Sequence, residues 1–389
     1  MTSTTLPAAN FIFGTKTIVI DTTAPNAPVM NAITTPSSTT QPTVTGTGTN
    51  GDTINVFADG TNVGTTTVAN GSWSVQTSVL TQGERVMTAK ATDPAGNQSV
   101  ASVAQTIVID ATAPTGFTTG TVTVAGTGTK VTGYYNASNQ SGVTITVPIA
   151  DDSTLLNGKV QAQVQVNSGA WTGVGSLVNI PAINTTQDVS VTHAQLIGLT
   201  NYGSGVVLRF RATLTDVGGN ITTGSTSADT LTVDTVAPAV NSQTLASNND
   251  NTALAMSGDT VTLTVTANEP INNLSGVVFK AAGNPVAEAV TTSSTNATTK
   301  TAAFTVPASL TGDVTVTYIV TDVAGNTTTQ TDQLAGNVLV DTTAPSFETV
   351  TVNQEIVSTA SDKQVYLYFK LDENVNSNGV VTTHYTAPG

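Results

Sequence analysis

Asp21-Thr22-Thr23-Ala24-Pro25 is the stretch that decides how this chain is divided, because close versions of it occur four times. The other copies are Asp110–Pro114, Asp234–Pro238 and Asp341–Pro345. Each copy follows a run of β-branched or aliphatic residues and precedes a new segment of alternating apolar residues. Successive copies lie roughly 90 to 125 residues apart, which is the length of a domain and not of a short solenoid repeat. The stretch, called the junction below, therefore predicts successive β-domains joined at these points.

The composition of the 389 residues favours strands over helices. Charged residues make up 9% and aromatic residues 5%, while Thr and Val, which suit half-buried strands, are abundant. Helix-forming Leu, Lys, Glu and Arg are scarce. Low charge also suits a disordered chain, but the regular alternation of Val and Ile with Thr indicates strands.

The net charge is −14 at pH 7, from 25 acidic and 11 basic residues. This balance lacks the basic surface that nucleic acids require, and it lacks a polybasic membrane patch. The absence of cysteine excludes disulfides and thiolate metal sites. No apolar run approaches the roughly 18 to 20 residues of a membrane span, and no signal peptide is recognisable. We therefore expect no nucleic-acid partner and no membrane insertion in this segment.

The first stretch between two junctions contains seven short segments of alternating character. The segments are Val29–Ile33, Thr43–Thr47, Thr53–Ala58, Val63–Val68, Ser72–Val75, Arg85–Thr92 and Val100–Ile109. Asp59-Gly60 and Asn70-Gly71 are hairpin signals between some of them. Seven such strands in about ninety residues predict an immunoglobulin-like sandwich. The fold class expected for the chain is all-β, with tandem immunoglobulin-like β-sandwich domains in an elongated array.

The junctions divide the chain into five parts. These are the tail of a preceding repeat (1–21), repeat one (22–110), a longer repeat two with insertions (111–234), repeat three (235–341) and an incomplete fourth repeat (342–389). Because both ends fall inside repeats, we expect a segment of a longer array. Neighbouring repeats of the same chain are then its expected partners.

A second motif, Asp-x-x-Gly-Asn, precedes three of the junctions by one strand. Its copies are Asp93–Asn97, Asp216–Asn220 and Asp322–Asn326. Asp, Gly and Asn favour tight turns, so the motif predicts the turn between the sixth and seventh strands. In a seven-strand sandwich this turn, the loop after the second strand and the incoming junction meet at one end of the domain.

Acidic residues occupy all three of these segments, although acids are few in the chain. Converging carboxylates repel one another, and a divalent cation removes that cost. Ca²⁺ accepts about six to eight oxygen ligands, whereas Mg²⁺ requires near-octahedral geometry and Zn²⁺ prefers His or Cys. Ca²⁺ is thus the expected ion. The candidate ligands are Asp21, Asp52, Asp93 and Asn97 for repeat one; Asp110, Asp151 or Asp152, Asp216 and Asn220 for repeat two; Asp234, Glu269, Asp322 and Asn326 for repeat three; and Asp341 with Asp372 or Glu373 for the fourth.

A weaker pair of metal candidates is expected at the opposite end of the domains. Glu84 and Asp313 each follow a glycine before a strand, and each should lie near the next junction. The alternative is that both are edge-strand charges that discourage aggregation. Asp and Asn of the turn motif likewise stabilise turns without any metal. Trp73 and Trp171 are expected in a core or on a strand face, with carbohydrate stacking as the alternative.

The junction, the Asp-x-Ala-Gly-Asn turn and the stretch Gly64–Val75 together resemble the tandem bacterial Ig-like repeats of giant cell-surface adhesins and biofilm-associated proteins. Repeat one resembles them over its whole length. Repeats two and three keep both end motifs and differ in the middle. The resemblance implies an exported, cell-surface stalk that calcium makes rigid.

No nucleophile elbow, His-Glu-x-x-His motif or phosphate loop occurs, so we expect no enzyme. The leading hypothesis is a structural stalk segment of an extracellular bacterial adhesin that supports cell adhesion or biofilm formation. One alternative is a module that binds a glycan or a host protein through the inserted middle of repeat two. Another is an accessory or surface-layer segment of a larger extracellular protein.

Overall fold

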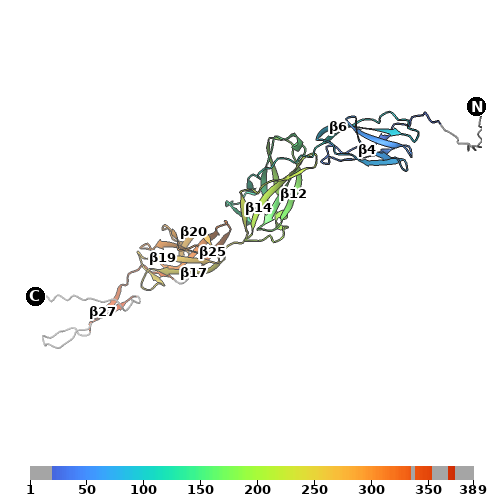
Figure 1. Cartoon of the computed structure of the whole chain (residues 1–389). Helices are drawn as coiled ribbons and strands as arrows, with labels where there is room; N and C mark the ends of the chain where they lie inside the picture. The colour runs from blue at the N-terminus through green and yellow to red at the C-terminus, as the bar shows by residue number, and fades with distance from the viewer. Residues whose placement is uncertain (1–19, 334–337, 353–366, 373–389) are drawn as a thin grey trace, which may run out of the picture. The chain divides into compact units, whose positions relative to one another are not determined.

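The computed structural model describes residues 20–333, 338–352 and 367–372 (Figure 1). The chain divides into two compact units, Met1–Asp234 and Thr235–Gly389. Strands dominate both units, which confirms the all-β prediction. None of the helices in the described residues is long and apolar enough to cross a membrane.

Repeat one, in the first unit, is a sandwich of two antiparallel sheets. The first sheet has the order β1 (Val29–Met30), β2 (Thr43–Thr47) and β5 (Ser72–Gln76). The second has the order β4 (Thr61–Thr67), β3 (Thr53–Ala58), β6 (Gly83–Thr92) and β7 (Gln105–Ile109). Alternate residues of β3, namely Ile54, Val56 and Ala58, point into the core as the period of two requires.

Trp73 on β5 belongs to this core, as predicted for it. Its side chain is 4% exposed, and Nε1 donates to the carbonyl of Thr47 at 3.1 Å. Gly46 on the paired strand β2 makes room for the ring. A Cβ at Gly46 would lie 2.4 Å from the indole and 2.0 Å from the carbonyl oxygen of Val29. The ring is therefore enclosed by its own sandwich and is not available for stacking on a sugar.

The seventh strand of repeat one is shorter than predicted. The expected strand began at Val100, whereas β7 begins at Gln105. Two serine side chains explain the difference, because the main-chain N–H groups of Ala91 and Ala89 on β6 donate to the hydroxyls of Ser99 and Ser102, each at 2.9 Å. Hydroxyl acceptors of this kind compete locally with the strand ladder.

Repeat two, also in the first unit, has two sheets, of which the second is the larger. The first sheet has the order β13 (Thr185–Val191), β10 (Val143–Ile149) and β8 (Val122–Val124). The second has the order β12 (Trp171–Asn179), β11 (Lys159–Val166), β14 (Val207–Thr215), β16 (Thr230–Asp234) and β9 (Tyr134–Asn136), with β15 (Ile221–Thr223) on β14. The inserted middle contains β12, β13 and the helix α1 (His193–Ile197). Trp171 on β12 lies on a strand face under the guanidinium of Arg211, 4.3 Å from the ring centroid.

Repeat three lies in the second unit and follows the same plan. One sheet has the order β17 (Val240–Ser247), β19 (Thr260–Ala267), β23 (Thr299–Thr305) and β22 (Thr291–Ser294). The other has the order β18 (Leu254–Ala255), β26 (Leu339–Val340), β24 (Gly312–Asp322), β20 (Ile271–Ala281) and β21 (Asn284–Pro285), with β25 (Thr327–Gln333) on β24. Beyond it, β27 (Phe347–Val352) pairs with β28 (Leu367–Leu371). Repeats one, two and three each contain a separate hydrophobic core.

Candidate metal centres at the domain junctions

The register of β3 and β6 places Asp52 beside Asp93 in repeat one. Thr53 pairs with Thr92, so the residues just outside these strand ends are neighbours. Asp52 is 3% exposed, and its Oδ2 is buried without a hydrogen-bond partner. Burial, and then the negative charge of Asp93, raise the pKa of Asp52. An ionised carboxylate in this position is costly unless a positive charge neutralises it.

The three Asp-x-x-Gly-Asn motifs form turns with one shared hydrogen-bond pattern, as predicted. In repeat one the main-chain N–H of Asn97 donates to Asp93 Oδ1 at 2.8 Å, and Asn97 Nδ2 donates to Asp93 Oδ2 at 2.9 Å. The same pairs of contacts recur, at the same lengths, in the turns of repeats two and three. The glycines of the turns have φ values of +95°, +92° and +91°, a region that favours glycine.

These turn contacts keep the second carboxylate of repeat one ionised. The side chain of Asn97 is the main cause that lowers the pKa of Asp93, and the main-chain N–H groups of the turn add to it. Asp93 therefore directs a full negative charge toward Asp52. The pair combines an ionised carboxylate with a buried one that lacks a hydrogen-bond donor.

The asparagine of the turn also binds the incoming junction. Asn97 Nδ2 donates to the main-chain carbonyl of Asp21 at 3.1 Å, and Asn220 Nδ2 donates to that of Asp110 at 2.7 Å. The sequence suggested these asparagines as oxygen ligands, and the structure shows their amide nitrogens acting as donors. They hold the junction against the turn without requiring a metal.

The side chains of the junction aspartates stabilise their own turns. Oδ1 of Asp21, Asp110 and Asp341 accepts the N–H of the residue two positions later, at 2.9, 3.3 and 2.9 Å. The carboxylates of Asp21, Asp52 and Asp93, all described residues, do not form a group of three within 4.8 Å. Repeat one thus unites Asp52, Asp93, Asn97 and the carbonyl of Asp21, while the Asp21 carboxylate caps a turn.

Gln82 is a junction residue that the sequence did not indicate. Its Nε2 donates to Asp110 Oδ1 at 3.1 Å, and its Oε1 accepts the N–H of Ala111 at 3.0 Å. Glu84, the weaker metal candidate two residues later, is exposed on β6. Asp313, the matching candidate, is exposed on β24 and pairs in register with Leu339. No sequence motif marks Gln82 as a residue that binds the junction.

Repeat two differs from repeat one at the loop after its second strand. Lys159 pairs with Thr215, which places Gly158 beside Asp216 where repeat one has Asp52. A side chain has no space there, because a Cβ at Gly158 would lie 2.4 Å from the carbonyl oxygen of Thr215.

The two acids predicted for that loop lie further from the strand end. Asp152 caps the short 3-10 helix Ser153–Leu155 by accepting the N–H of Thr154 at 3.0 Å, and Asp151 is exposed. Asp110 and Asp216 are both buried, yet among these described acids no three come within 4.8 Å. Repeat two therefore brings Asp216, Asn220 and the carbonyl of Asp110 together without its loop acids.

In repeat three, Glu269 and Asp322 have carboxylate oxygens within 4.8 Å of each other. Asp322 is 1% exposed, and Glu269 is partly buried. Asn326, predicted with them, is the turn asparagine bound to Asp322. Asp234, the remaining candidate of this set, ends β16 in the first unit, where its Oδ1 accepts the hydroxyl of Ser204 at 3.3 Å.

Asp372 caps the chain directly after the fourth junction. Its two carboxylate oxygens accept the N–H and the hydroxyl of Ser346 at 2.8 and 2.6 Å, and these contacts lower its pKa. Asn268 Oδ1 likewise accepts the N–H of Ala239 at 2.8 Å, and Ala239 also follows a junction proline. Glu373, the other candidate of this set, lies outside the described residues.

Two threonines hold the proline of the junction. Thr222 and Thr328 each lie two residues after the turn asparagine, and their hydroxyls donate to the carbonyls of Pro114 and Pro238 at 2.5 and 2.6 Å. The sequence did not indicate them, although their constant distance from the turn is a signal that could have done so. In repeat two the junction is therefore bound at both ends, through the carbonyls of Asp110 and Pro114.

The pKa of Asp52 predicts how metal-free repeat one responds to pH. Because this pKa is raised in the folded state, stability is fully present below the ordinary value and is lost as pH rises through the raised value. The lowered pKa of Asp93 acts in a separate window, below the ordinary value. We expect Asp52→Asn to remove the loss of stability that the parent shows as pH rises above the ordinary pKa of an aspartate.

This expectation is tested by urea unfolding of the full chain in EDTA, in a Trp171→Phe background. Trp73 is then the remaining tryptophan and reports on repeat one. Asp59→Asn, at a half-exposed acid of the same repeat, is the control. Its free energy of unfolding should depend on pH with the same slope as that of the parent. An equal slope in the parent and in Asp52→Asn would contradict the interpretation.

Residues 29–111 match the family model of the bacterial Ig-like domain. No curated protein sequence matches the chain. Similar solved structures include the FN1-FN3 domains of chicken CNTN1, which are 13% identical with a TM-score of 0.25, the chain covering 79% of its own length and 98% of theirs. Others are titin I67-I69 (10% identity, TM-score 0.30, 82% and 96% covered) and the N-terminal eight Ig domains of DSCAM (14%, 0.24, 89% and 40%). The family match thus covers residues 29–111 in repeat one, and the sheets of repeats one, two and three make the chain a series of Ig-like β-sandwiches.

Proposed function

We propose that this chain is an extracellular stalk segment of a bacterial surface adhesin, and that Ca²⁺ bound at the junctions makes it rigid. The match of repeat one to the bacterial Ig-like family supports the cell-surface context. Tandem sandwiches joined by a recurring junction support a mechanical role. Such a segment would project an adhesive domain away from the cell and so support adhesion or biofilm formation.

The observation that carries the calcium part is the buried Oδ2 of Asp52, which has no hydrogen-bond donor and lies beside the ionised Asp93. Buried polar atoms are nearly always paired, so an unpaired carboxylate oxygen favours a positively charged ligand. Carboxylate and main-chain oxygens are the donors that Ca²⁺ prefers. The carbonyl of Asp21, which Asn97 holds at this turn, is a further oxygen at the same place.

Repeat three supports the same chemistry with Glu269 and Asp322. Asp234, which the sequence predicts as a ligand with them, directly precedes Thr235, the first residue of the second unit. The junction proline restricts one dihedral angle and pushes the preceding alanine toward extended geometry. Extracellular Ca²⁺ modules bind with Kd of about 10⁻⁴ to 10⁻³ M, so the ion would bind after export.

Spin-label distances test the stiffening directly. The chain has no cysteine, so Ser176→Cys in repeat two and Thr329→Cys in repeat three, both exposed, can be labelled specifically. We expect a narrow distance distribution by double electron–electron resonance in millimolar Ca²⁺ and a broad one in chelator, because the ion removes bending at the junction.

Glu269→Gln should abolish the narrowing, because it removes one carboxylate of the proposed site. Asp332→Asn, at an exposed acid of the same repeat, should leave it intact. Equal widths with and without Ca²⁺ in the parent would refute calcium stiffening at this junction.

A further inference from the structure

Lys300 occupies a core position on β23. The strand alternates so that Lys300, Ala302 and Phe304 point inward, and Lys300 is only 8% exposed. Buried lysines normally have an acidic partner. The ammonium of Lys300 donates to Ser294 Oγ at 2.6 Å and to the carbonyl of Asn296 at 3.0 Å, both neutral acceptors. Among the described residues, the ion pairs do not include Lys300.

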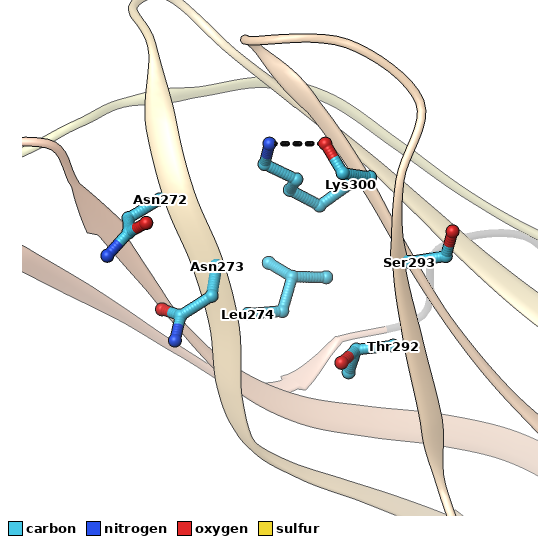
Figure 2. A pocket seen from close by; sticks show the side chains of 7 residues that line it. Asn272, Asn273, Leu274, Thr292, Ser293 and Lys300 are labelled. Carbon is cyan, nitrogen blue, oxygen red and sulfur yellow. Dashed lines mark hydrogen bonds between the residues drawn. The ribbon is translucent and has the colours of Figure 1, made fainter.

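The ammonium belongs to a pocket of about 210 Å³ within repeat three. Figure 2 shows Lys300 and Leu274 between two strands, one carrying Asn272 and Asn273 and the other carrying Thr292 and Ser293. The pocket therefore has one cation, two amides, hydroxyls and one apolar side chain. Its lining contains no acidic side chain, in a chain whose net charge is −14.

The position of the pocket in the sandwich leaves it open to a ligand. β22, which carries the hydroxyls, is the edge strand of its sheet. β21 pairs only with Lys280 and Ala281, so the part of β20 that carries the two asparagines also lies along an edge. A pocket between two sheet edges is accessible from the side of the domain. Its volume is below the ~300 Å³ of pockets for drug-sized ligands, which suits one small unit.

We propose that this pocket binds a sugar acid, a monosaccharide unit that carries one carboxylate. A single ammonium matches a single negative charge, and its charge-assisted hydrogen bond to a carboxylate is stronger than those to neutral acceptors. The amides and hydroxyls supply donors and acceptors for the ring hydroxyls. Leu274 offers an apolar contact to a ring face. The site differs from the proposed junction metal sites, and its test does not depend on them.

Methyl β-D-glucuronide and the neutral methyl β-D-glucoside are matched probes for the full chain, with binding followed by saturation-transfer NMR. We expect the glucuronide to bind about tenfold more tightly, because it alone presents a carboxylate to Lys300. Lys300→Met keeps the length of the side chain and should remove the preference. Lys280→Met removes a partly exposed ammonium of the same repeat, paired with Asp332, and should keep the preference.

Two outcomes would overturn the proposal. One is equal binding of the two probes, or a preference that survives in Lys300→Met. The other is displacement of the glucuronide by acetate or sulfate at equal concentration, which would indicate an adventitious ion only. If Lys300→Met does not fold, Asn273→Ala on the exposed rim decides: binding of the glucuronide should weaken severalfold, and unchanged binding would refute the site.

Discussion

Calcium at about 10 mM should raise the unfolding temperature of repeat one by roughly 10 to 20 °C. A Kd of about 10⁻⁴ M stabilises the folded state by about 2.7 kcal/mol at a hundredfold excess of ligand. One kcal/mol moves the transition of a domain of this size by roughly 4 to 8 °C. The cause is the removal of two costs, the unpaired Oδ2 of Asp52 and its repulsion by Asp93.

The effect of Asp52→Asn on the stability of repeat one should reverse when Ca²⁺ is added. In chelator the variant should be at least as stable as the parent, because a neutral amide replaces a buried charge. In Ca²⁺ it should be less stable than the parent, because the ion loses a ligand. A purely structural Asp52 would give the same order of stabilities under both conditions.

Thermal unfolding followed by Trp73 fluorescence in the Trp171→Phe background measures both effects. Asp59→Asn, which alters a half-exposed acid paired with Arg85 at 3.3 Å, should keep the full calcium shift. Mg²⁺ should give a smaller shift, because it dehydrates reluctantly and requires octahedral geometry. A parent protein whose transition does not move in Ca²⁺ would remove the basis of the proposed site.

Gly46→Ala should destabilise repeat one by about 3 kcal/mol, at the upper end of the range for overpacked cores. The added Cβ would lie 2.0 Å from the carbonyl oxygen of Val29 and 2.4 Å from the indole of Trp73. Neither neighbour can move easily, since one is main chain and the other is 4% exposed. Trp73 emission should also shift to longer wavelength as the ring loses its packing.

Gly48→Ala is the matched control two residues along the same chain segment. A Cβ at Gly48 would meet a methyl group of Val68 at 3.1 Å, which a small side-chain movement relieves. We expect less than about 1 kcal/mol for this variant by urea unfolding. Equal stability of Gly46→Ala and the parent would show that Trp73 is not held as the structure describes.

Most strands of repeat one, the turns and the junctions could be predicted from the sequence, because they depend on neighbouring residues. Thr43–Thr47 and Thr53–Ala58 are strands with the predicted limits, since the alternation of inward and outward side chains needs only the residues of the strand. The turn motif is equally local, because Asp93 and Asn97 bond to each other across a glycine with positive φ. The Ca²⁺ ligands remain predictions, although two of the acid pairs they require lie together.

Which residues meet at a junction could not be predicted from the sequence, because it depends on the folded domain. Strand register sets Asp52 beside Asp93 in repeat one and Gly158 beside Asp216 in repeat two, and register depends on pairing between distant strands. The direction of the Asn97 amide depends on a carbonyl 76 residues earlier in the chain. The surroundings of Lys300 follow from the same cause. Alternation predicts that its side chain points inward, while only the fold shows that its ammonium meets the neutral acceptors of Ser294 and Asn296.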